Sequence, residues 1–256
     1  MRTQVIGQEL ITLTSVESTN KHAAELLAQG KLAHGAVILA DEQTAGRGQR
    51  GRIWRSGVGL DLTVSVLLRF EHLKATEQFA LAKVAALAVH DVITEAMRVA
   101  VDSGSERIRI KWPNDVLVDR RKVSGILIKN EIVGGLVMST VMGFGINVNS
   151  GDLDAEFNAT SLRLETGLEH DRMAILEHLC QRLEHRISLW QNDPDDLARD
   201  YTSLLWGRGR YADFELDGQS FSARPMDVDE DGRLLVEDED GKVQVFGYDR
   251  LRFAPR

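Results

Sequence analysis

The stretch from Ala45 to Trp54, which reads AGRGQRGRIW, constrains this chain more than any other. Three glycines alternate in it with three arginines, namely Gly46, Gly48, Gly51, Arg47, Arg50 and Arg52. Glycine lets a ligand come close to bare backbone amides, and arginine offers a planar fork of donors that suits phosphate or carboxylate. No acidic residue interrupts the stretch. It therefore predicts a loop that holds an anion.

The spacing of these glycines also matches the dinucleotide-binding fingerprint, in which a helix must follow directly. Here apolar and polar side chains alternate from Leu60 to Leu68, which predicts a half-buried strand instead of a helix. A Rossmann domain is therefore not expected. A hairpin turn that is basic only by chance stays open as the alternative to an anion loop.

A capped helix and a mixed sheet are expected around this loop. Ser18 or Thr19 can cap a helix that ends at Gly30, and a long apolar helix is expected over 76–97. Strands are expected over 1–16, 36–40, 60–68, 107–111, 116–118, 123–129 and 132–148, and helices begin at Asp171 and at Asp193, the latter running to Trp206. This order predicts an α+β fold with a mixed central sheet. It also predicts two domains, 1–206 and a small β domain over 207–256.

Composition narrows the choice of partners. The 256 residues carry a net charge of −8, which argues against broad binding to nucleic acid or to an anionic membrane. Cys180 is the only cysteine, so neither an intramolecular disulfide nor a thiolate metal cluster is expected, and its apolar helical stripe predicts a core residue. The sequence shows no leader peptide and no long apolar run, so a cytoplasmic protein is the expectation.

Several common chemistries lack their motif in this sequence. There is no P-loop, no His-Glu-x-x-His, no paired cysteine and no Gly-x-Ser-x-Gly elbow, so no metal held by the protein alone is expected. What remains is the basic glycine loop, the capped helix start, the segment Lys111–Asp115 and Lys122 on a hairpin. This set suits positioning and charge stabilisation at a phosphorus centre.

Five motifs, taken in order, resemble those of the biotin–protein ligase family. They are Ser18-Thr19-Asn20, the run from Gln43 to Trp54, Lys111-Trp112-Pro113-Asn114-Asp115, Lys122-Val123-Ser124-Gly125-Ile126-Leu127 and Gly143-Phe144-Gly145-Ile146-Asn147. Together they cover Ser18 to Asn149, and residues 207–256 resemble that family's small SH3-like domain. The resemblance implies a mixed sheet flanked by helices, as in class II aminoacyl-tRNA synthetases, with a C-terminal SH3-like β-barrel.

The resemblance also implies a reaction and its substrates. The carboxylate of biotin attacks the α-phosphate of ATP, which gives biotinyl-5′-adenylate and pyrophosphate, and the adenylate then acylates one lysine of a biotin carboxyl carrier protein domain. The partner is the carrier domain of acetyl-CoA carboxylase or of another biotin-dependent carboxylase. Mg²⁺ is expected to arrive with ATP and to keep several waters, without a dedicated protein cage. A monomer and a homodimer both stay open.

The position of each motif assigns residues to roles by resemblance. Catalytic roles fall to Lys122, Arg47 and Asp115. Biotin binding falls to Ser18, Thr19, Asn20, Gln43, Arg47, Gly48, Gln49, Lys122 and Gly125. Nucleotide binding falls to Arg50, Trp54, Lys111, Asn114, Asp115 and Asn147, the last of which also lines the biotin pocket. Without the resemblance, Lys122 would count as a surface lysine and Ser18-Thr19-Asn20 as helix caps.

Two departures from the family pattern carry expectations. Gln49 stands where the family commonly has arginine, so the enzyme is expected to release its adenylate more readily. Some members begin with a helix-turn-helix domain that binds DNA. Here the first motif begins at Ser18, so a monofunctional form that does not bind DNA is expected.

Two other functions stay open. Lipoate–protein ligases and octanoyltransferases share the fold, but their alkyl substrates favour an apolar pocket, whereas Ser18, Thr19, Asn20 and Gln43 are polar. A non-catalytic biotin or nucleotide sensor has no need of a lysine and arginines that stabilise developing charge. Pyrophosphate release with biotin, lipoate or octanoate distinguishes the three functions.

Overall fold

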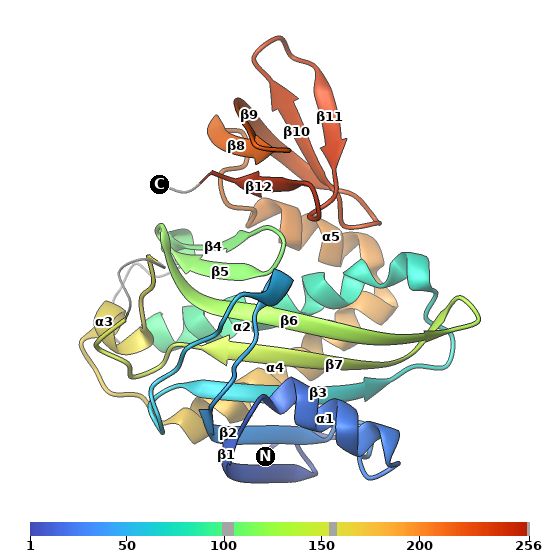
Figure 1. Cartoon of the computed structure of the whole chain (residues 1–256), viewed down its shortest axis with the longest axis vertical. Coiled ribbons are helices and arrows are strands. Elements are labelled where there is room, and N and C mark those ends of the chain that lie inside the picture. Colours follow the sequence, from blue (N-terminus) through green and yellow to red (C-terminus); the bar gives the residue numbers. More distant parts are fainter. Residues whose placement is uncertain (99–104, 154–157, 255–256) are drawn as a thin grey trace.

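The computed structural model describes residues 1–98, 105–153 and 158–254, which form two sheets (Figure 1). The larger sheet contains β1 (Leu10–Val16), β2 (Val37–Gln43), β3 (Leu62–Arg69), β4 (Ile108–Lys111), β5 (Asp115–Val118), β6 (Arg121–Val133) and β7 (Leu136–Ile146). Their order is β1-β2-β3-β7-β6-β5-β4. Only the β1–β2 pair is parallel among these described neighbours, so the expected mixed sheet is confirmed.

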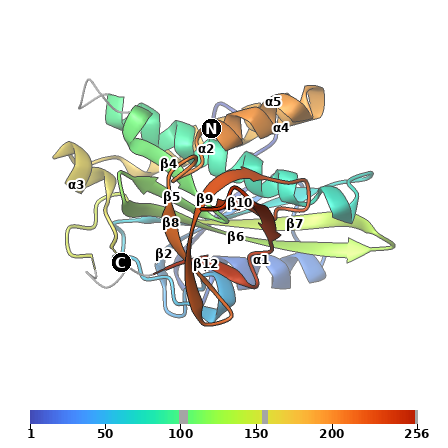
Figure 2. The same cartoon turned by 90° about the horizontal axis from the view of Figure 1, so that it is seen from above.

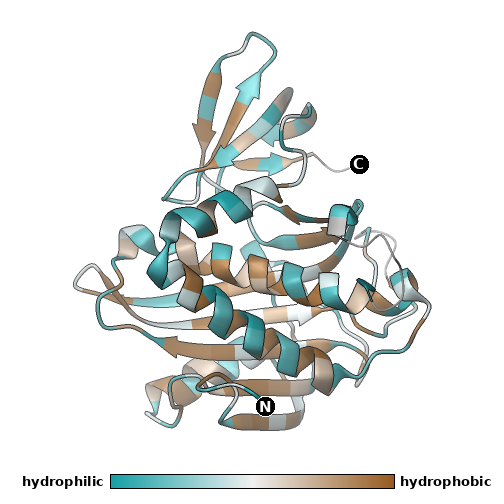
Figure 3. Cartoon of the chain, turned by 180° about the vertical axis from the view of Figure 1, so that it is seen from behind, coloured by the Kyte–Doolittle hydropathy of each residue, from teal (hydrophilic) through white to brown (hydrophobic). Residues whose placement is uncertain are grey.

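Helices cover both faces of the large sheet. α1 (Thr19–Ala28) lies on the face turned to the viewer in Figure 1. α2 (Phe79–Arg98) and α4 (Arg172–Asn192) pack against each other on the opposite face, next to α5 (Pro194–Ser203), as Figure 3 shows from behind. A short helix, α3 (Leu162–Thr166), stands at one end of the sheet. No helix in the described residues is both long and apolar enough to cross a membrane.

Each face of the sheet has its own apolar layer. The larger layer lies between the sheet and α2, which is buried over most of its length because it packs on the sheet and on α4. A smaller layer under α1 joins Ala23 to Ile38, Leu67 and Val141. Cys180 is a core residue, as expected, and burial raises the pKa of its thiol to about 12. The two layers leave the sheet covered on both sides.

β3 is buried on both faces, so the expectation of a half-buried strand is wrong. Its apolar residues enter the larger layer, and Thr63 and Ser65, which alternate with them, lie on the side of α1 with only 2% and 1% of their surface exposed. Each hydroxyl has a partner there; Thr63 Oγ1, for example, donates to Ala40 O at 2.8 Å. Buried polar groups are tolerated when they are hydrogen-bonded. The polar residues of β3 can therefore alternate with apolar ones although neither face of the strand is exposed to water.

The segment after α5 also differs from expectation. α5 ends at Ser203 instead of continuing to Trp206. The backbone from Leu204 to Trp206 then runs beside β4, where Leu204 O accepts from Ile110 N at 2.9 Å and Trp206 N donates to Ile110 O at 2.8 Å. This segment covers an otherwise unpaired sheet edge and leads into the second sheet.

The second sheet lies beyond β4 and β5 at one end of the molecule (Figures 1 and 2). It contains β8 (Ala212–Leu216), β9 (Gln219–Val228), β10 (Leu234–Asp238), β11 (Val243–Phe246) and β12 (Leu251–Phe253), in the order β11-β10-β9-β8-β12. All pairs are antiparallel. The sheet is consistent with the expected SH3-like domain, although no pairing joins β11 to β12 within the described residues, so it is open where a barrel would close.

One apolar core continues through both sheets. Trp112 Nε1 donates to Gly232 O at 2.9 Å, and the rings of Trp206 and Phe253 meet edge-on with centroids 4.9 Å apart. Gly232 lies against the ring of Phe79, where an added Cβ would stand 2.2 Å from a ring carbon. Because the core is continuous, packing does not divide the chain, and the domain boundary between residues 206 and 207 remains a prediction from strand order and composition.

Candidate active site

Three glycines form the floor of the site on the α1 side of the large sheet. Gly125 on β6 pairs with Gly145 on β7. Gly143 precedes Gly145 by two residues on β7 and therefore lies on the same face of the sheet. An added Cβ would stand 2.2 Å from the ring of Trp54 at Gly145, 2.4 Å from Asn20 Oδ1 at Gly143 and 3.0 Å from Lys122 Nζ at Gly125. These positions need glycine because other side chains approach the backbone closely. We call them the glycine floor.

A buried polar wall stands beside the glycine floor. Asn20 Nδ2 donates to Leu127 O at 2.9 Å, and Asn20 Oδ1 accepts from Ser65 Oγ at 2.6 Å. Ser65 Oγ also lies 2.8 Å from Thr19 Oγ1. All three side chains are buried. Because each is fixed by hydrogen bonds, the wall presents donors and acceptors in one arrangement.

Gln43 fixes the start of α1 from outside the helix. Its Oε1 accepts from Thr19 N at 2.8 Å and lies 3.2 Å from Thr19 Oγ1. Ser18 occupies the N-cap position and is buried, but its side chain makes no capping hydrogen bond. The helix begins and ends near the predicted residues, while the capping acceptor comes from β2 instead of from the cap residue.

The glycine–arginine stretch is a hairpin that crosses this face of the sheet. Arg47 and Ile53 form an antiparallel bridge, Trp54 N donates to Gly46 O at 3.0 Å, and a single 3-10 turn, η1 (Gln49–Gly51), makes the tip. At Gly46 a Cβ would stand 2.4 Å from Trp54 O. Residues 46–54 are called the arginine hairpin below. The backbone therefore forms the hairpin turn that the sequence analysis gave as the alternative to an anion loop. A hairpin turn can still bind an anion through its arginines.

The arginines of this hairpin are exposed. Among the described residues, Arg47, Arg50 and Arg52 form no ion pair. Arg47 lies near the start of α1: a hydrogen bond from Lys21 lowers the pKa of the exposed Glu17 carboxylate, and the charge of Arg47 adds to that effect. Three guanidinium groups therefore remain available to an anion, and that of Arg47 lies near the start of α1.

Trp54 carries the hairpin back to the glycine floor. Its ring lies against Gly145 and Gly125, and Lys122 Nζ stands 5.4 Å from the ring centroid, close enough for a cation–π contact. Trp54 Nε1 is buried and meets no acceptor within the described residues. The indole thus closes the floor on the side of Lys122.

Lys122 and Asp115 form an ion pair with 2.7 Å between Nζ and Oδ1. Asp115 lies on β5 opposite Gly125, and the neighbouring Asn114 is fixed by its Nδ2, which donates to Ile126 O at 2.8 Å. Lys111 stands opposite Asp115 in register, but its Nζ lies 5.6 and 5.3 Å from the ring centroids of Trp206 and Phe253. The ammonium of Lys111 therefore turns toward the second sheet, away from the pair.

A strap of residues 158–160 holds the backbone of Lys122. Lys122 N donates to Asn158 O and Lys122 O accepts from Thr160 N, both at 2.9 Å, and Asn147 Nδ2 donates to Thr160 O at 2.9 Å. The carboxylate of Glu165 anchors the strap. It is 2% exposed and accepts from Thr160 Oγ1 at 2.6 Å, and from two arginines, Arg107 at 2.8 Å and Arg121 at 2.6 Å. Glu165 thereby steadies Lys122 through the strap.

The fold brings most of the predicted site residues to one place. Ser18, Thr19, Asn20, Gln43, Trp54, Asn114, Asp115, Lys122, Gly125 and Asn147 gather around the glycine floor, with Arg47, Gly48, Gln49 and Arg50 on the hairpin above it. Lys111 lies apart, toward the second sheet. Sequence reasoning missed Ser65, Glu165 and the buried Asp61, which accepts from the amides of Gly57 and Val148, both at 2.9 Å. Only the hydrogen bonds that they make in the folded chain reveal them.

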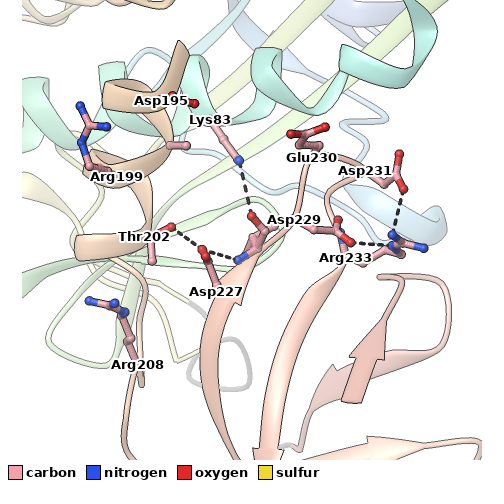
Figure 4. Close-up of a pocket in the computed structure, with 12 residues that line it drawn as sticks. Lys83, Asp195, Arg199, Thr202, Arg208, Asp227, Asp229, Glu230, Asp231 and Arg233 are labelled. Atoms are coloured by element: carbon pink, nitrogen blue, oxygen red, sulfur yellow. Dashed lines mark hydrogen bonds and ion pairs between the residues drawn. The ribbon is translucent and has the colours of Figure 1, made fainter. Parts of the chain in front are cut away.

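No group of three or more His, Cys, Asp and Glu side chains within the described residues suits a metal ion. A cavity of about 890 Å³ lies elsewhere, between α5 and the turn after β9, and Figure 4 shows its lining. Burial lowers the pKa of Lys83 there, and nearby carboxylates oppose this. In that cavity Arg233 binds Asp229 at 2.7 Å and Asp231 at 3.0 Å.

Comparison with known proteins points to one family. Residues 12–147, just over half of the chain, match the Biotin/lipoate A/B protein ligase family. The chain is 33% identical over 261 residues to the bifunctional ligase/repressor BirA of Bacillus subtilis, a match that covers 97% of this chain and 75% of that protein. It is 33% identical over 245 residues to the biotin–[acetyl-CoA-carboxylase] ligase of Mycobacterium tuberculosis, covering 93% of this chain and 88% of the relative.

A solved structure agrees with these relatives. The biotin protein ligase from Aquifex aeolicus, in complex with biotin and ATP, superposes with a TM-score of 0.73 at 26% identity, and the match covers 96% of this chain and 100% of that one. The chain therefore belongs to the Biotin/lipoate A/B protein ligase family, and its resemblance to the biotin–protein ligases is confirmed.

Proposed function

We propose that this chain joins biotin to a lysine of a carrier protein in two steps, using ATP. In the first step a biotin carboxylate oxygen attacks the α-phosphorus of ATP, and the bond to the β-phosphate oxygen breaks, which gives biotinyl-5′-adenylate and pyrophosphate. In the second step a lysine amine attacks the acyl carbon, AMP leaves, and an amide forms. The observation that carries this proposal is the Lys122–Asp115 pair beside Trp54 on the glycine floor.

The polar wall supports biotin as the acid. A ureido group has one acceptor oxygen and two N–H donors, and Thr19, Asn20, Ser65 and Gln43 supply hydroxyl and amide groups already fixed by hydrogen bonds. An octanoyl or lipoyl chain has no N–H or carbonyl group along its length that could pair with these hydroxyl and amide groups. The wall therefore favours biotin over an alkyl acid.

The charges favour catalysis over passive binding. Lys122 can neutralise negative charge on the carboxylate and the α-phosphate as the bond forms, and Arg47 can do so from the hairpin. Gly48, Gln49 and Arg50 would close over the acyl phosphate. Trp54 offers a face for the adenine, while Asn114 and Asn147 would line the nucleotide side.

We propose that Mg²⁺ enters with ATP, where it would offset the charge of the triphosphate. The side-chain oxygens of Asn114 and Asp115 are the kind of ligand that Mg²⁺ prefers. Because Mg²⁺ keeps several waters, one or two protein oxygens suffice. The acceptor that we propose is the carrier domain of acetyl-CoA carboxylase or of another biotin-dependent carboxylase, as the names of the relatives indicate for them.

One experiment separates the three functions. The protein is incubated with ATP, Mg²⁺ and either biotin, lipoate or octanoate, and pyrophosphate release is measured. Release with biotin alone supports the proposal, release with lipoate or octanoate supports the related ligases, and no release with any acid supports a sensor. A carrier domain is then added, and its intact mass should increase by one biotinyl group.

A further inference from the structure

A cavity of about 760 Å³ opens between the β4–β5 hairpin and residues 203–212, which lead into the second sheet. Five arginines line it, namely Arg107, Arg109, Arg120, Arg208 and Arg210, against two carboxylates, Glu106 and Asp119. We call it the arginine cleft. Although the whole chain carries a net charge of −8, the lining of this cleft has more basic than acidic side chains.

Two of these five arginines, Arg120 and Arg210, have no ion-pair partner among the described residues. Arg107 is bound by Asp119 and Glu165, each at 2.8 Å, and Arg208 Nε donates to Met226 O at 3.2 Å. Arg120 and Arg210 are exposed and form no ion pair with any described residue. In the cavity of Figure 4, Arg233 is bound by two carboxylates of that cavity, Asp229 and Asp231.

The arginine cleft adjoins the candidate active site. Ile108 and Ile110 of β4 point into the core, so Arg109 and Lys111 share the opposite face and stand about 7 Å apart along the strand. Lys111 lies opposite Asp115, which binds Lys122. The edge formed by β4 and the cleft is therefore within reach of a protein that brings a lysine to this site.

The make-up of the cleft favours an extended partner over a small anion. Arg120 and Arg210 come from separate elements, the β5–β6 turn and the segment before β8, so a partner that binds both must contact both elements. Tyr211, half exposed, stands on the same wall. Arginine and tyrosine are the residues most enriched at the centres of protein interfaces.

We propose that the arginine cleft docks an acidic surface of the carrier domain that receives biotin. The inference rests on the proposed function. It goes further by stating that the surface of the carrier domain that contacts this chain is acidic. Complementary charge speeds encounter and weakens with salt. It affects the second step, in which the carrier binds, and leaves the formation of the adenylate unchanged.

The test compares two double charge reversals in the full-length protein. The first is Arg120→Glu with Arg210→Glu. The control, Lys31→Glu with Lys242→Glu, changes net charge equally at exposed lysines outside the cleft. Two rates are measured, pyrophosphate release with biotin and ATP alone, and biotin transfer to an acidic carrier domain of an acetyl-CoA carboxylase. We expect the KM for the carrier to rise at least about fivefold in the cleft variant only, and this difference to shrink between about 50 and about 500 mM salt.

Three outcomes would overturn the inference. The first is a KM for the carrier that changes no more in the cleft variant than in the control, and the second is a change that does not depend on salt. In the third, the cleft variant loses binding of inorganic triphosphate while its KM for the carrier stays constant, which would make the cleft a small-anion site. Thermal melting guards against misfolding, and Arg120→Gln with Arg210→Gln should give a smaller rise in KM. Absence of pyrophosphate release in the unmodified protein would instead refute the proposed function.

Discussion

The glycine floor with its polar wall and the arginine hairpin lie on the same face of one sheet but are held in different ways. Thr19, Asn20 and Ser65 are buried and bonded to one another or to the backbone. The arginines of the hairpin are exposed and unpaired within the described residues, and a few backbone hydrogen bonds hold the turn. The first region is built before a ligand arrives, whereas the second has charge that only a ligand can offset. In the function that we propose, recognition of biotin falls to the first region and charge stabilisation to the second.

Lys122 stands where the two regions meet, so its removal is expected to have the largest effect. Lys122→Ala should slow adenylate formation by roughly a thousandfold, because it removes the ammonium group beside Asp115 that we propose neutralises charge on the carboxylate and the α-phosphate. Unfolding free energy should change by less than about 1 kcal/mol, since the pair is partly exposed. Pre-steady-state pyrophosphate release and chemical denaturation measure both. Lys129→Ala, an exposed lysine on the same strand, is the control, and an equal rate for the two variants would make Lys122 an ordinary surface residue.

Gly145→Ala breaks the glycine floor alone. Its Cβ would collide with the ring of Trp54 at 2.2 Å, so the indole must move, and we expect kcat/KM for biotin and ATP to fall by about a hundredfold. Intrinsic tryptophan fluorescence should shift as well. Gly151→Ala, where an added Cβ meets nothing within 4 Å, is the matched control. Normal kinetics in Gly145→Ala would show that the floor has no part in the site.

Glu165→Gln tests whether the strap positions Lys122. We expect kcat to fall about tenfold with little change in the KM for biotin, because the strap holds the lysine backbone and not the polar wall. Stability should fall by about 2 kcal/mol, since two arginines lose their carboxylate. Asp91→Asn is the control, because Asp91 receives Arg186 through two hydrogen bonds of 2.8 Å on the far face of the sheet. If both variants lose equal activity for equal stability, Glu165 is only structural.

Gln49→Arg tests the arginine hairpin alone, and among these variants it should have the smallest effect. An added guanidinium at the tip can bind the acyl phosphate, so the adenylate should dissociate about three- to tenfold more slowly, as expected for one extra charged hydrogen bond. Release of labelled adenylate into excess unlabelled biotin and ATP gives the off-rate. Identical off-rates for the two proteins would reject the idea that Gln49 makes the enzyme release its intermediate readily.

The sequence predicted the elements better than their environment. The long apolar helix, the capped starts at Asp171 and Asp193 and the strands around Lys122 follow from local pattern, and the structure has them within a few residues. The burial of β3 was predicted wrongly, because an alternation of apolar and polar residues distinguishes the two faces of a strand but does not show what covers each face. α5 was drawn too long because pairing with β4 captures Leu204–Trp206.

The sequence by itself determined which residues are chemically special, because glycine, arginine, lysine and cap-forming types recur in motifs that local spacing makes visible. Tertiary structure alone decided how they meet. Ser65 faces Asn20, Gln43 caps a helix from another strand, and Glu165 steadies Lys122, all through pairs far apart in the chain. Such pairings depend on strand register and on the close approach of backbones at Gly143 and Gly145. The physical reason is that hydrogen bonds and burial act through space, so a linear pattern names the groups without fixing their partners.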